Sequence, residues 1–459
     1  MSDALPLPPH PSLQQYKKRA KELVKICKSG DPDALHAWVK VWIESLVKLY
    51  RLDISLPRDA HRAYTPAEIG YHVERAAARI GKHLNAGQRP SRRVCTLAQA
   101  QLALAREHGF ASWPRFATHV AGLARARSPV SAFEAAVDAV VGGDRATLAK
   151  LLHEHPLLVR ARSTRDHRST LLHYVSANGV EDFRQKTPRN IVAITKLLLA
   201  AGADVNAESD AYGGRSTTLG LTATSYHPEV AGVQLPLLEL LIEQGARIDG
   251  PDGGSGVNGC LHNRRQAAAE FLAAHGARLD LEGAAGVGRL DVVKSFFHSD
   301  GSLKPPATAE QMKAGFAWAC EFGRTEVVDF LLQKGLEAGA PLHPEGGETG
   351  LHWAAFAGHT DIVRLLLEQG APVDVKDRRH DGTPLGWALY GWGVSTGKAA
   401  QPQYYEVVAL LARVGATLEP EWYEQNEDRQ RAARRIQSDP RMRAALRGQH
   451  GPRVRGRSR

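Results

Sequence analysis

The chain has 459 residues, of which 43% are apolar and 24% are charged, values that exclude wholesale disorder and allow two or three domains. It contains no run of about 18 apolar residues, and residues 1–11 lack the apolar stretch of a secretory signal. We therefore expect no membrane-spanning helix and favour a cytoplasmic protein. The net charge of +10 raises the question of a nucleic-acid partner.

The charge is distributed unevenly along the chain. Residues 1–127 carry 21 basic and 10 acidic residues, a net of +11, whereas residues 128–420 carry 27 and 34, a net of −7. Residues 421–459 carry 11 basic and 5 acidic residues, a net of +6. We predict a basic N-terminal helical module over 1–127, a central repeat region over 128–420, and a basic C-terminal helix with a disordered tail over 421–459.

Four stretches of the first segment have helical apolar spacing, and Ser112 is placed to cap a further helix after a turn at Gly109. The four predicted helices are Leu13–Cys27, Asp33–Tyr50, Pro66–Leu84 and Leu97–Glu107. The four cysteines, Cys27, Cys95, Cys260 and Cys320, lie far apart and form no CxxC pair. The sequence therefore predicts neither a disulfide framework nor a cysteine-type zinc site, and it favours a reducing compartment.

A unit of about 34 residues recurs through the central segment. Its clearest copy, Thr349–Asp374, indicates a short helix, a turn at Gly358, a second amphipathic helix and a stop at Gly370. Thr349 is placed to cap the first helix, and glycine readily adopts the left-handed conformation that follows a helix end. We count seven copies, preceded by a helix pair over 131–163 that is suited to cap the stack.

The copy at Thr349 closely resembles the ankyrin repeat, whose T-x-L-H-x-A-A-x-x-G-H core it contains. Residues 101–116 resemble a helical segment that precedes the repeats in many bacterial ankyrin proteins. The resemblance implies an all-α fold, with a helical module ahead of an ankyrin solenoid whose helix-turn-helix repeats carry short hairpin fingers. It also implies a non-catalytic protein-interaction module, without naming the partner or the oligomeric state.

Several copies depart from this pattern. The loop between the two helices is enlarged at 180–190, 226–234 and 392–404, always at the same point of the unit, so we predict that the three loops share one edge of the stack. Between Asn263 and Gly288 the spacing shrinks to 25 residues, so we expect Asp280 to lead directly into the next helix.

Motifs for catalysis, metal binding or cofactor binding are not apparent. The 20 histidines include no HExxH pair, and Cys260-Leu261-His262 lacks a second ligand pair. The glycine-rich stretch 250–259 lacks the Lys-Ser/Thr of a phosphate loop. The resemblance implies that His173 and His352 brace turns by hydrogen bonding. We expect no enzymatic activity, no cofactor and no metal.

The aromatic residues point to a binding surface. Trp318, Trp353 and Trp387 share one register at intervals of 35 and 34 residues. In the ankyrin family this register packs largely between helices, and the register three residues further on tends to face the concave groove. Large exposed aromatic residues are typical anchors of interfaces. The predicted partner-binding residues are Phe356, Tyr390, Trp392, Glu321, Trp353 and Trp387, with Trp392 in an enlarged loop.

The basic ends leave three alternatives open. Lysines 17, 18, 21, 25 and 28 lie along a single predicted helix, a cluster that phosphate binding would need, although no nucleic-acid-binding motif accompanies them. The protein could thus be a nucleic-acid-associated adaptor. The basic module could instead dock on the acidic repeats, or it could hold an enzyme or toxin activity.

Overall fold

The computed structural model describes residues 4–8, 10–53, 66–85, 95–250, 254–342, 346–394, 402–418 and 427–448. The chain divides into two compact units, Met1–Gly254 and Ser255–Arg459. Within the described residues, no helix combines the length and apolar character needed to cross a membrane. The C-terminal residues 449–459, predicted as a disordered tail, lie outside the described part.

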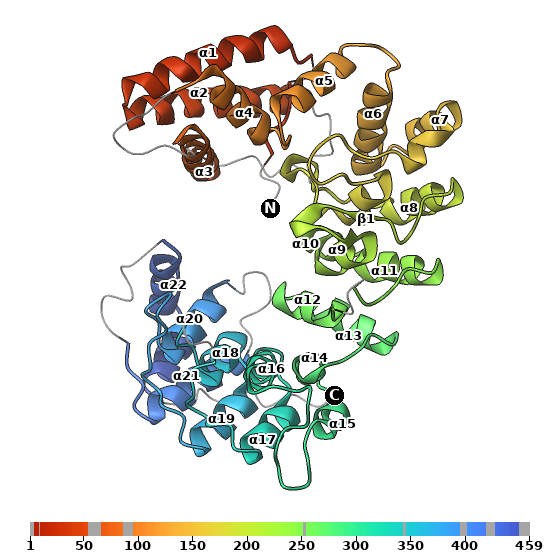
Figure 1. The fold of residues 1–459 in the computed structure, drawn as a ribbon. Helices are drawn as coiled ribbons and strands as arrows, with labels where there is room; N and C mark the ends of the chain where they lie inside the picture. Colours follow the sequence, from red (N-terminus) through yellow and green to blue (C-terminus); the bar gives the residue numbers. More distant parts are fainter. Residues whose placement is uncertain are drawn as a thin grey trace, which may run out of the picture. The chain divides into compact units, whose positions relative to one another are not determined.

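The first unit begins with a helical module whose predicted helices are all present (Figure 1). Thr96 and Ser112 cap the fourth and fifth helices, each accepting a hydrogen bond from a backbone N–H three residues on, as N-cap residues do. Trp42, Phe110 and Phe116 lie at the centre of the core. The helices are α1 (Leu13–Ser29), α2 (Pro32–Asp53), α3 (Pro66–Asn85), α4 (Leu97–Glu107) and α5 (Trp113–Leu123).

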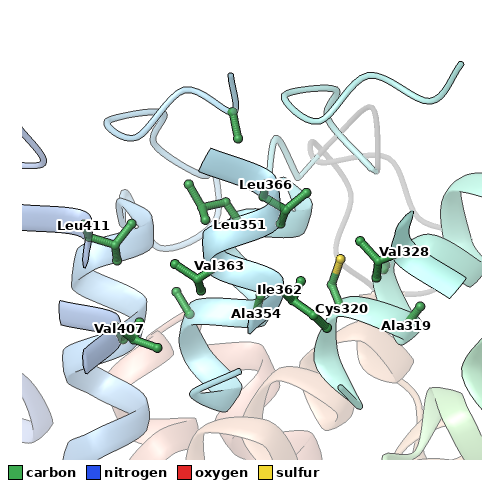
Figure 2. Packing of buried hydrophobic residues seen from close by; sticks show 14 of the residues in the cluster. Ala319, Cys320, Val328, Leu351, Ala354, Ile362, Val363, Leu366, Val407 and Leu411 are labelled. Carbon is green, nitrogen blue, oxygen red and sulfur yellow. The ribbon is translucent and has the colours of Figure 1, made fainter. Parts of the chain in front are cut away.

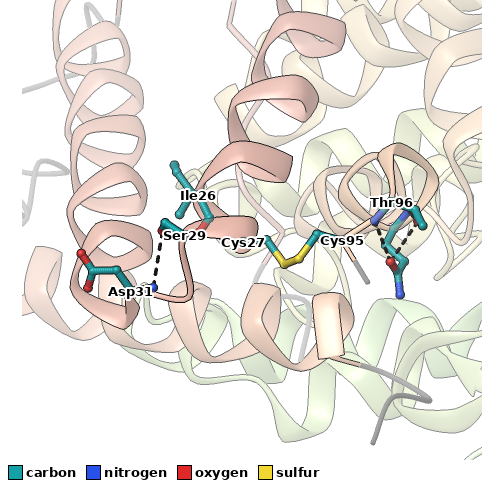
Figure 3. Close-up of a disulfide and its surroundings, with 7 residues drawn as sticks. Ile26, Cys27, Ser29, Asp31, Cys95 and Thr96 are labelled. Atoms are coloured by element: carbon teal, nitrogen blue, oxygen red, sulfur yellow. Dashed lines mark hydrogen bonds between the residues drawn. A yellow bond between two sulfur atoms is a disulfide. The ribbon is translucent and has the colours of Figure 1, made fainter. Parts of the chain in front are cut away.

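A disulfide joins Cys27, near the end of α1, to Cys95, just before α4 (Figure 3). The sequence predicted no disulfide framework, and the spacing of the cysteines gave no indication of this single pair. The two residues are 68 positions apart in sequence, but α1 packs on α4 and brings their Cα atoms to 6.0 Å. Cys260 and Cys320 are buried thiols outside this disulfide, and burial raises the pKa of the Cys260 thiol to about 12.

The rest of the first unit consists of short helix pairs and a two-stranded hairpin. The predicted capping pair is present as α6 and α7, whereas the copy that starts at Thr170 has a 3-10 helix as its first helix. Glu208 pairs with Thr217 in the hairpin, and Ser209 pairs with Ser216. The elements are α6 (Pro129–Gly142), α7 (Arg145–Glu154), η2 (Pro156–Arg160), η3 (Leu171–Ser176), η4 (Asp182–Arg184), α8 (Ile191–Ala200), β1 (Glu208–Ser209), η5 (Ala211–Gly213), β2 (Ser216–Thr217), α9 (Thr218–Thr224), α10 (Tyr226–Val230) and α11 (Gln234–Glu243).

The second unit stacks helix pairs so that the first helices of successive repeats lie side by side (Figure 1). Buried aliphatic residues such as Leu351, Ile362 and Leu366 fill the space between neighbouring pairs (Figure 2). As predicted, Asp280 leads directly into a helix, which it caps. The helices are α12 (Gly256–His262), α13 (Gln266–Ala274), α14 (Leu281–Gly286), α15 (Leu290–Ser295), α16 (Ala309–Glu321), α17 (Thr325–Gln333), α18 (Gly350–Ala357), α19 (Thr360–Glu368), α20 (Pro384–Val394), α21 (Pro402–Arg413), α22 (Glu427–Ser438) and α23 (Pro440–Leu446).

The C-terminal segment forms two helices rather than the single one predicted, because Asp439 caps a new helix that starts at Pro440. Both helices cover the last repeat, α22 on α20 and α23 on α21. Arg435 lies 4.1 Å from the ring of Trp392, and Arg441 lies 4.4 Å from the ring of Tyr405. Part of the basic C-terminal charge therefore packs against the fold.

The three enlarged loops differ in structure. Residues 181–184 are partly buried, and Tyr226–Val230 form a helix, α10. Residues 392–394 end α20, residues 395–401 lie outside the described part, and residues 402–404 begin α21. Since the loops also belong to different units, the prediction of a shared edge stays a prediction.

Candidate functional site

Five of the six predicted binding residues lie together on the first helices of three successive repeats. We call these five residues the aromatic surface: Glu321 on α16, Trp353 and Phe356 on α18, and Trp387 and Tyr390 on α20. Residues three positions apart share one face of a helix, and α16, α18 and α20 are neighbours in the stack. Residues that share a position in the repeat therefore lie next to one another in a continuous row.

The rings of this surface contact one another across the repeats. Trp353 and Trp387 meet edge to face with centroids 5.0 Å apart, and Phe356 stacks on Tyr390 at 6.3 Å. Trp353, Phe356 and Trp387 are half-buried, and Tyr390 is 37% exposed. Such ring pairs stabilise each other beyond their buried area while leaving edges and faces open to a ligand.

Neighbouring carboxylates hold two of the three repeat tryptophans in place. The indole of Trp387 donates a hydrogen bond of 2.9 Å to Asp377, and the indole of Trp318 donates one of 2.9 Å to Glu282. Trp353, between them in the register, differs because its buried Nε1 has no acceptor among the described residues.

Glu321 is a buried carboxyl group in this row of aromatic residues. It is 7% exposed, and its Oε1 lies 3.2 Å from Nε of Arg264. Burial raises the pKa of Glu321 to about 7, and Arg264 offsets only part of this effect. The guanidinium of Arg264 also lies 5.2 Å from the ring centroid of Trp353 and 5.6 Å from that of Phe356. Sequence reasoning missed Arg264, because this residue belongs to a different repeat.

Trp392, the sixth predicted residue, is not part of the surface. Its predicted loop position is wrong, because α20 continues to Val394. The ring is 1% exposed and lies beneath Arg435 of α22, which also donates a hydrogen bond to the Trp392 carbonyl at 2.9 Å. Trp392 therefore packs the last repeat against the C-terminal helices.

The histidines of the repeat motif brace turns, as the resemblance implies. His352 accepts a hydrogen bond from the backbone N–H of Thr349 at 3.0 Å, and its other ring nitrogen donates to the Gly382 carbonyl at 3.1 Å. His173 makes the equivalent bonds to Thr170 and Ser216. Burial lowers the pKa of His173 to about 4, so the ring is neutral at pH 7.

A second group of buried ionic residues, which sequence reasoning missed, lies in the first unit. We call it the ionic cluster: Glu134, Arg165, Glu181 and Arg184. Every charge in it has an opposite partner within 3.5 Å, and Arg184 also donates a hydrogen bond to Asp138 at 2.8 Å. The cluster fastens the enlarged loop around residue 181 to α6.

The basic ends and the N-terminal module carry the remaining alternatives. Lysines 17, 18, 21, 25 and 28 of α1 are exposed, and a nucleic-acid role for this helix stays one of the open alternatives. The buried His108 lies among aromatic rings, and burial lowers its pKa to about 3. Its Nδ1 hydrogen-bonds the Leu5 carbonyl at 2.8 Å, which ties the chain start to α4. Within the described ranges, no group of three or more metal-ligating side chains is present.

Comparison with known families agrees with the stacked helix pairs of the second unit. Residues 281–377 and 316–420 match the family described as ankyrin repeats (3 copies). A search of curated proteins finds no match. The matched region, 281–420, contains all five residues of the aromatic surface, so that surface is built on ankyrin repeats, which are typical of protein-interaction modules. The fold is all-α, with ankyrin repeats preceded by a helical region.

Proposed function

We propose that this protein is a non-catalytic adaptor that holds a polypeptide partner on the aromatic surface of its ankyrin repeats. The observation that supports this most is the stacked pair of Phe356 and Tyr390 on neighbouring repeats. Interfaces concentrate their binding energy in a few large aromatic and arginine residues, which are rigid and amphipathic.

The surface is ordered before a partner arrives. Asp377 holds Trp387 by a hydrogen bond, and Trp387 in turn packs against Trp353 and Phe356. Side chains that are already fixed lose little conformational entropy on binding, so more of the contact energy appears as affinity. A rigid row of rings therefore suits recognition by shape.

Photo-crosslinking of the full-length chain tests the proposal. A photoreactive phenylalanine analogue at position 390 samples the aromatic surface, and the same analogue at Val414, which is 51% exposed after α21, serves as a control. We expect position 390 to capture a protein from extracts of the expressing cells, and position 414 not to capture it. Untagged wild-type protein should compete for the captured protein.

The double variant Phe356→Ala/Tyr390→Ala should compete at least about 30-fold less well, the loss expected when one hot-spot residue worth about 2 kcal/mol is removed. Leu157→Ala, at a residue that is 83% exposed in the first unit, should compete like wild type. Equal competition by all three proteins would remove the aromatic surface from the interaction. Circular dichroism checks that each variant keeps its helix content.

A further inference from the structure

Arg264 already occupies part of the aromatic surface, in a way that resembles a bound ligand. Its guanidinium lies over the rings of Trp353 and Phe356, and its Nε approaches the Glu321 carboxylate at 3.2 Å. The side chain is 51% exposed, so it lies over the surface without being part of the packed core. Trp353 and Phe356 lie about 90 residues further along the chain than Arg264, so this contact is a tertiary one.

The backbone of Arg264 is in an unfavourable conformation. Its φ is +57°, and it lies at the turn after the first helix where the next three repeats have Gly288, Gly323 and Gly358, with φ of 79°, 75° and 80°. Glycine adopts this left-handed region without steric cost, whereas the Cβ of any other residue lies too close to the following carbonyl oxygen. A strained residue in place of glycine indicates that the side chain at this position has a function.

Arg264 pairs with only one of the two oxygen atoms of the Glu321 carboxylate. Only Oε1 pairs with Arg264, while Oε2 is buried and has no hydrogen-bond partner among the described residues. A carboxylate accepts two parallel N–H donors from a guanidinium when the two groups meet side by side. A second arginine, approaching from outside the chain, would satisfy both oxygens.

Trp353 provides a second unused group beside Glu321. Its indole N–H is buried without an acceptor, although the equivalent groups of Trp318 and Trp387 donate to carboxylates. A buried donor that lacks a partner destabilises the fold, so an acceptor that arrives with a ligand removes this cost and gains affinity. A backbone carbonyl of a polypeptide is such an acceptor.

We infer that Glu321, Trp353 and Phe356 form a binding site for an arginine side chain of the partner polypeptide, and that Arg264 is a built-in competitor which the partner displaces. This inference rests on the proposed function and adds the chemical class of the ligand. Arginine suits the site better than lysine, because a planar guanidinium stacks on rings and binds a carboxylate with two bonds. The buried carboxylate of Glu321 would repel phosphate, which disfavours nucleic acid at this site.

A small probe tests the site without knowledge of the partner. The full-length chain, made with 5-fluorotryptophan, is titrated with N-acetyl-arginine methylamide while the 19F signal of Trp353 is followed by NMR. Trp353→Phe assigns that signal. N-acetyl-citrulline methylamide, a neutral analogue of the same shape, serves as the ligand control. The proteins are wild type, Arg264→Gly, Arg264→Gly/Glu321→Gln, and Arg289→Gly as a control for loss of an exposed arginine.

Arg264→Gly should bind the arginine probe about tenfold more tightly than wild type, as expected when a competitor that fills most of the site is removed. Arg289→Gly should bind like wild type. Loss of the carboxylate in the double variant should abolish the gain, and the citrulline probe should not bind. Glycine at position 264 matches the equivalent turns of the following repeats, so this variant should fold.

Equal affinity of wild type and Arg264→Gly would overturn the role of Arg264 as a competitor. Binding of citrulline, or undiminished binding to the double variant, would overturn the guanidinium site, as would the absence of probe binding to every protein. None of these outcomes affects the crosslinking test, since capture through Phe356 and Tyr390 does not require an arginine in the partner. The two proposals can therefore fail separately.

Discussion

Both units bury glutamates, but the buried carboxyl groups differ in the number of arginine partners and in the direction of their pKa shifts. In the ionic cluster of the first unit, Glu134 and Glu181 each lie close to both Arg165 and Arg184. Burial raises the pKa of Glu134, but the two arginines outweigh it and hold that pKa at about 2. In the second unit, burial of Glu321 outweighs its single half-exposed partner, Arg264, and the pKa rises to about 7.

The difference distinguishes a structural ion cluster from the binding site that we propose at Glu321. In the ionic cluster each charge lies close to two opposite charges, although Oε2 of Glu181 and Nε of Arg184 have no hydrogen-bond partner among the described residues. Removal of any one member leaves its partners uncompensated. A buried carboxyl group with too few partners is unstable in its charged form, so it gains from any cation that arrives. Perturbed pKa values occur in both units, so the raised pKa of Glu321 supports the proposed site together with geometry, namely the rings of Trp353 and Phe356 that share its contact with Arg264.

Loss of one member of the ionic cluster should lower the free energy of unfolding of the first unit more than any other change considered below. Arg184→Met removes the partner that hydrogen-bonds Glu134 at 2.6 Å and Asp138 at 2.8 Å, and should destabilise the first unit by about 3–5 kcal/mol. Arg364→Met is the matched control, because its pair with Glu406 is exposed and should contribute less than about 1 kcal/mol. Urea unfolding followed by hydrogen exchange measures each unit. Similar losses in both variants would show that the buried cluster behaves like a surface pair.

The second prediction concerns how the free energy of unfolding of the second unit depends on pH. The pKa of Glu321 is about 7 in the folded chain, against 4.5 ordinarily, so between these values the folded state binds more protons than the unfolded state. Stability of the second unit should therefore fall as pH rises from 4.5 to 7, by about 3 kcal/mol in total.

Glu321→Gln provides the control, because it keeps the shape of the side chain but does not titrate. The difference between wild type and this variant should change over pH 5–8, as measured from urea midpoints of the second unit by hydrogen exchange. Subtraction removes the contributions of other titratable groups, including His359, whose ring hydrogen-bonds the Glu321 backbone carbonyl and whose pKa is lowered by burial. A constant difference would mean that Glu321 titrates near its ordinary pKa.

The sequence predicted what local chemistry determines. Thr349, His352 and Gly358 form the cap, the brace and the left-handed turn within ten residues, so their pattern indicates the repeat directly. It did not predict contacts that tertiary packing creates. Cys27 meets Cys95 because α1 packs on α4, and Arg264 meets Glu321 from another repeat. The ionic cluster was missed for the same reason, since its members come from separate segments.

Trp392 shows how a local signal can mislead. The glycines at 391 and 393 are typical of a loop, but α20 continues through them because the C-terminal helices cover this end of the repeat. Substitution of Gly391 would place a Cβ 2.1 Å from the Phe356 carbonyl, so this glycine allows close helix packing. The aromatic surface could be predicted because residues three apart on one helix share a face. Trp392 could not be placed in this way, because its surroundings are formed by α22.

The smallest expected effect is also the sharpest test of Arg264. At pH 5, Glu321 is protonated in the folded chain, so Arg264→Gly loses no ion pair and gains up to about 1 kcal/mol from relief of the left-handed backbone. At pH 8 the same variant leaves the Glu321 carboxylate without its partner, and the second unit should become less stable than wild type. Arg264→Ala, which keeps the strained backbone, should be less stable than Arg264→Gly at both pH values. A variant effect of the same sign at pH 5 and pH 8 would mean that Arg264 does not compensate the charge of Glu321.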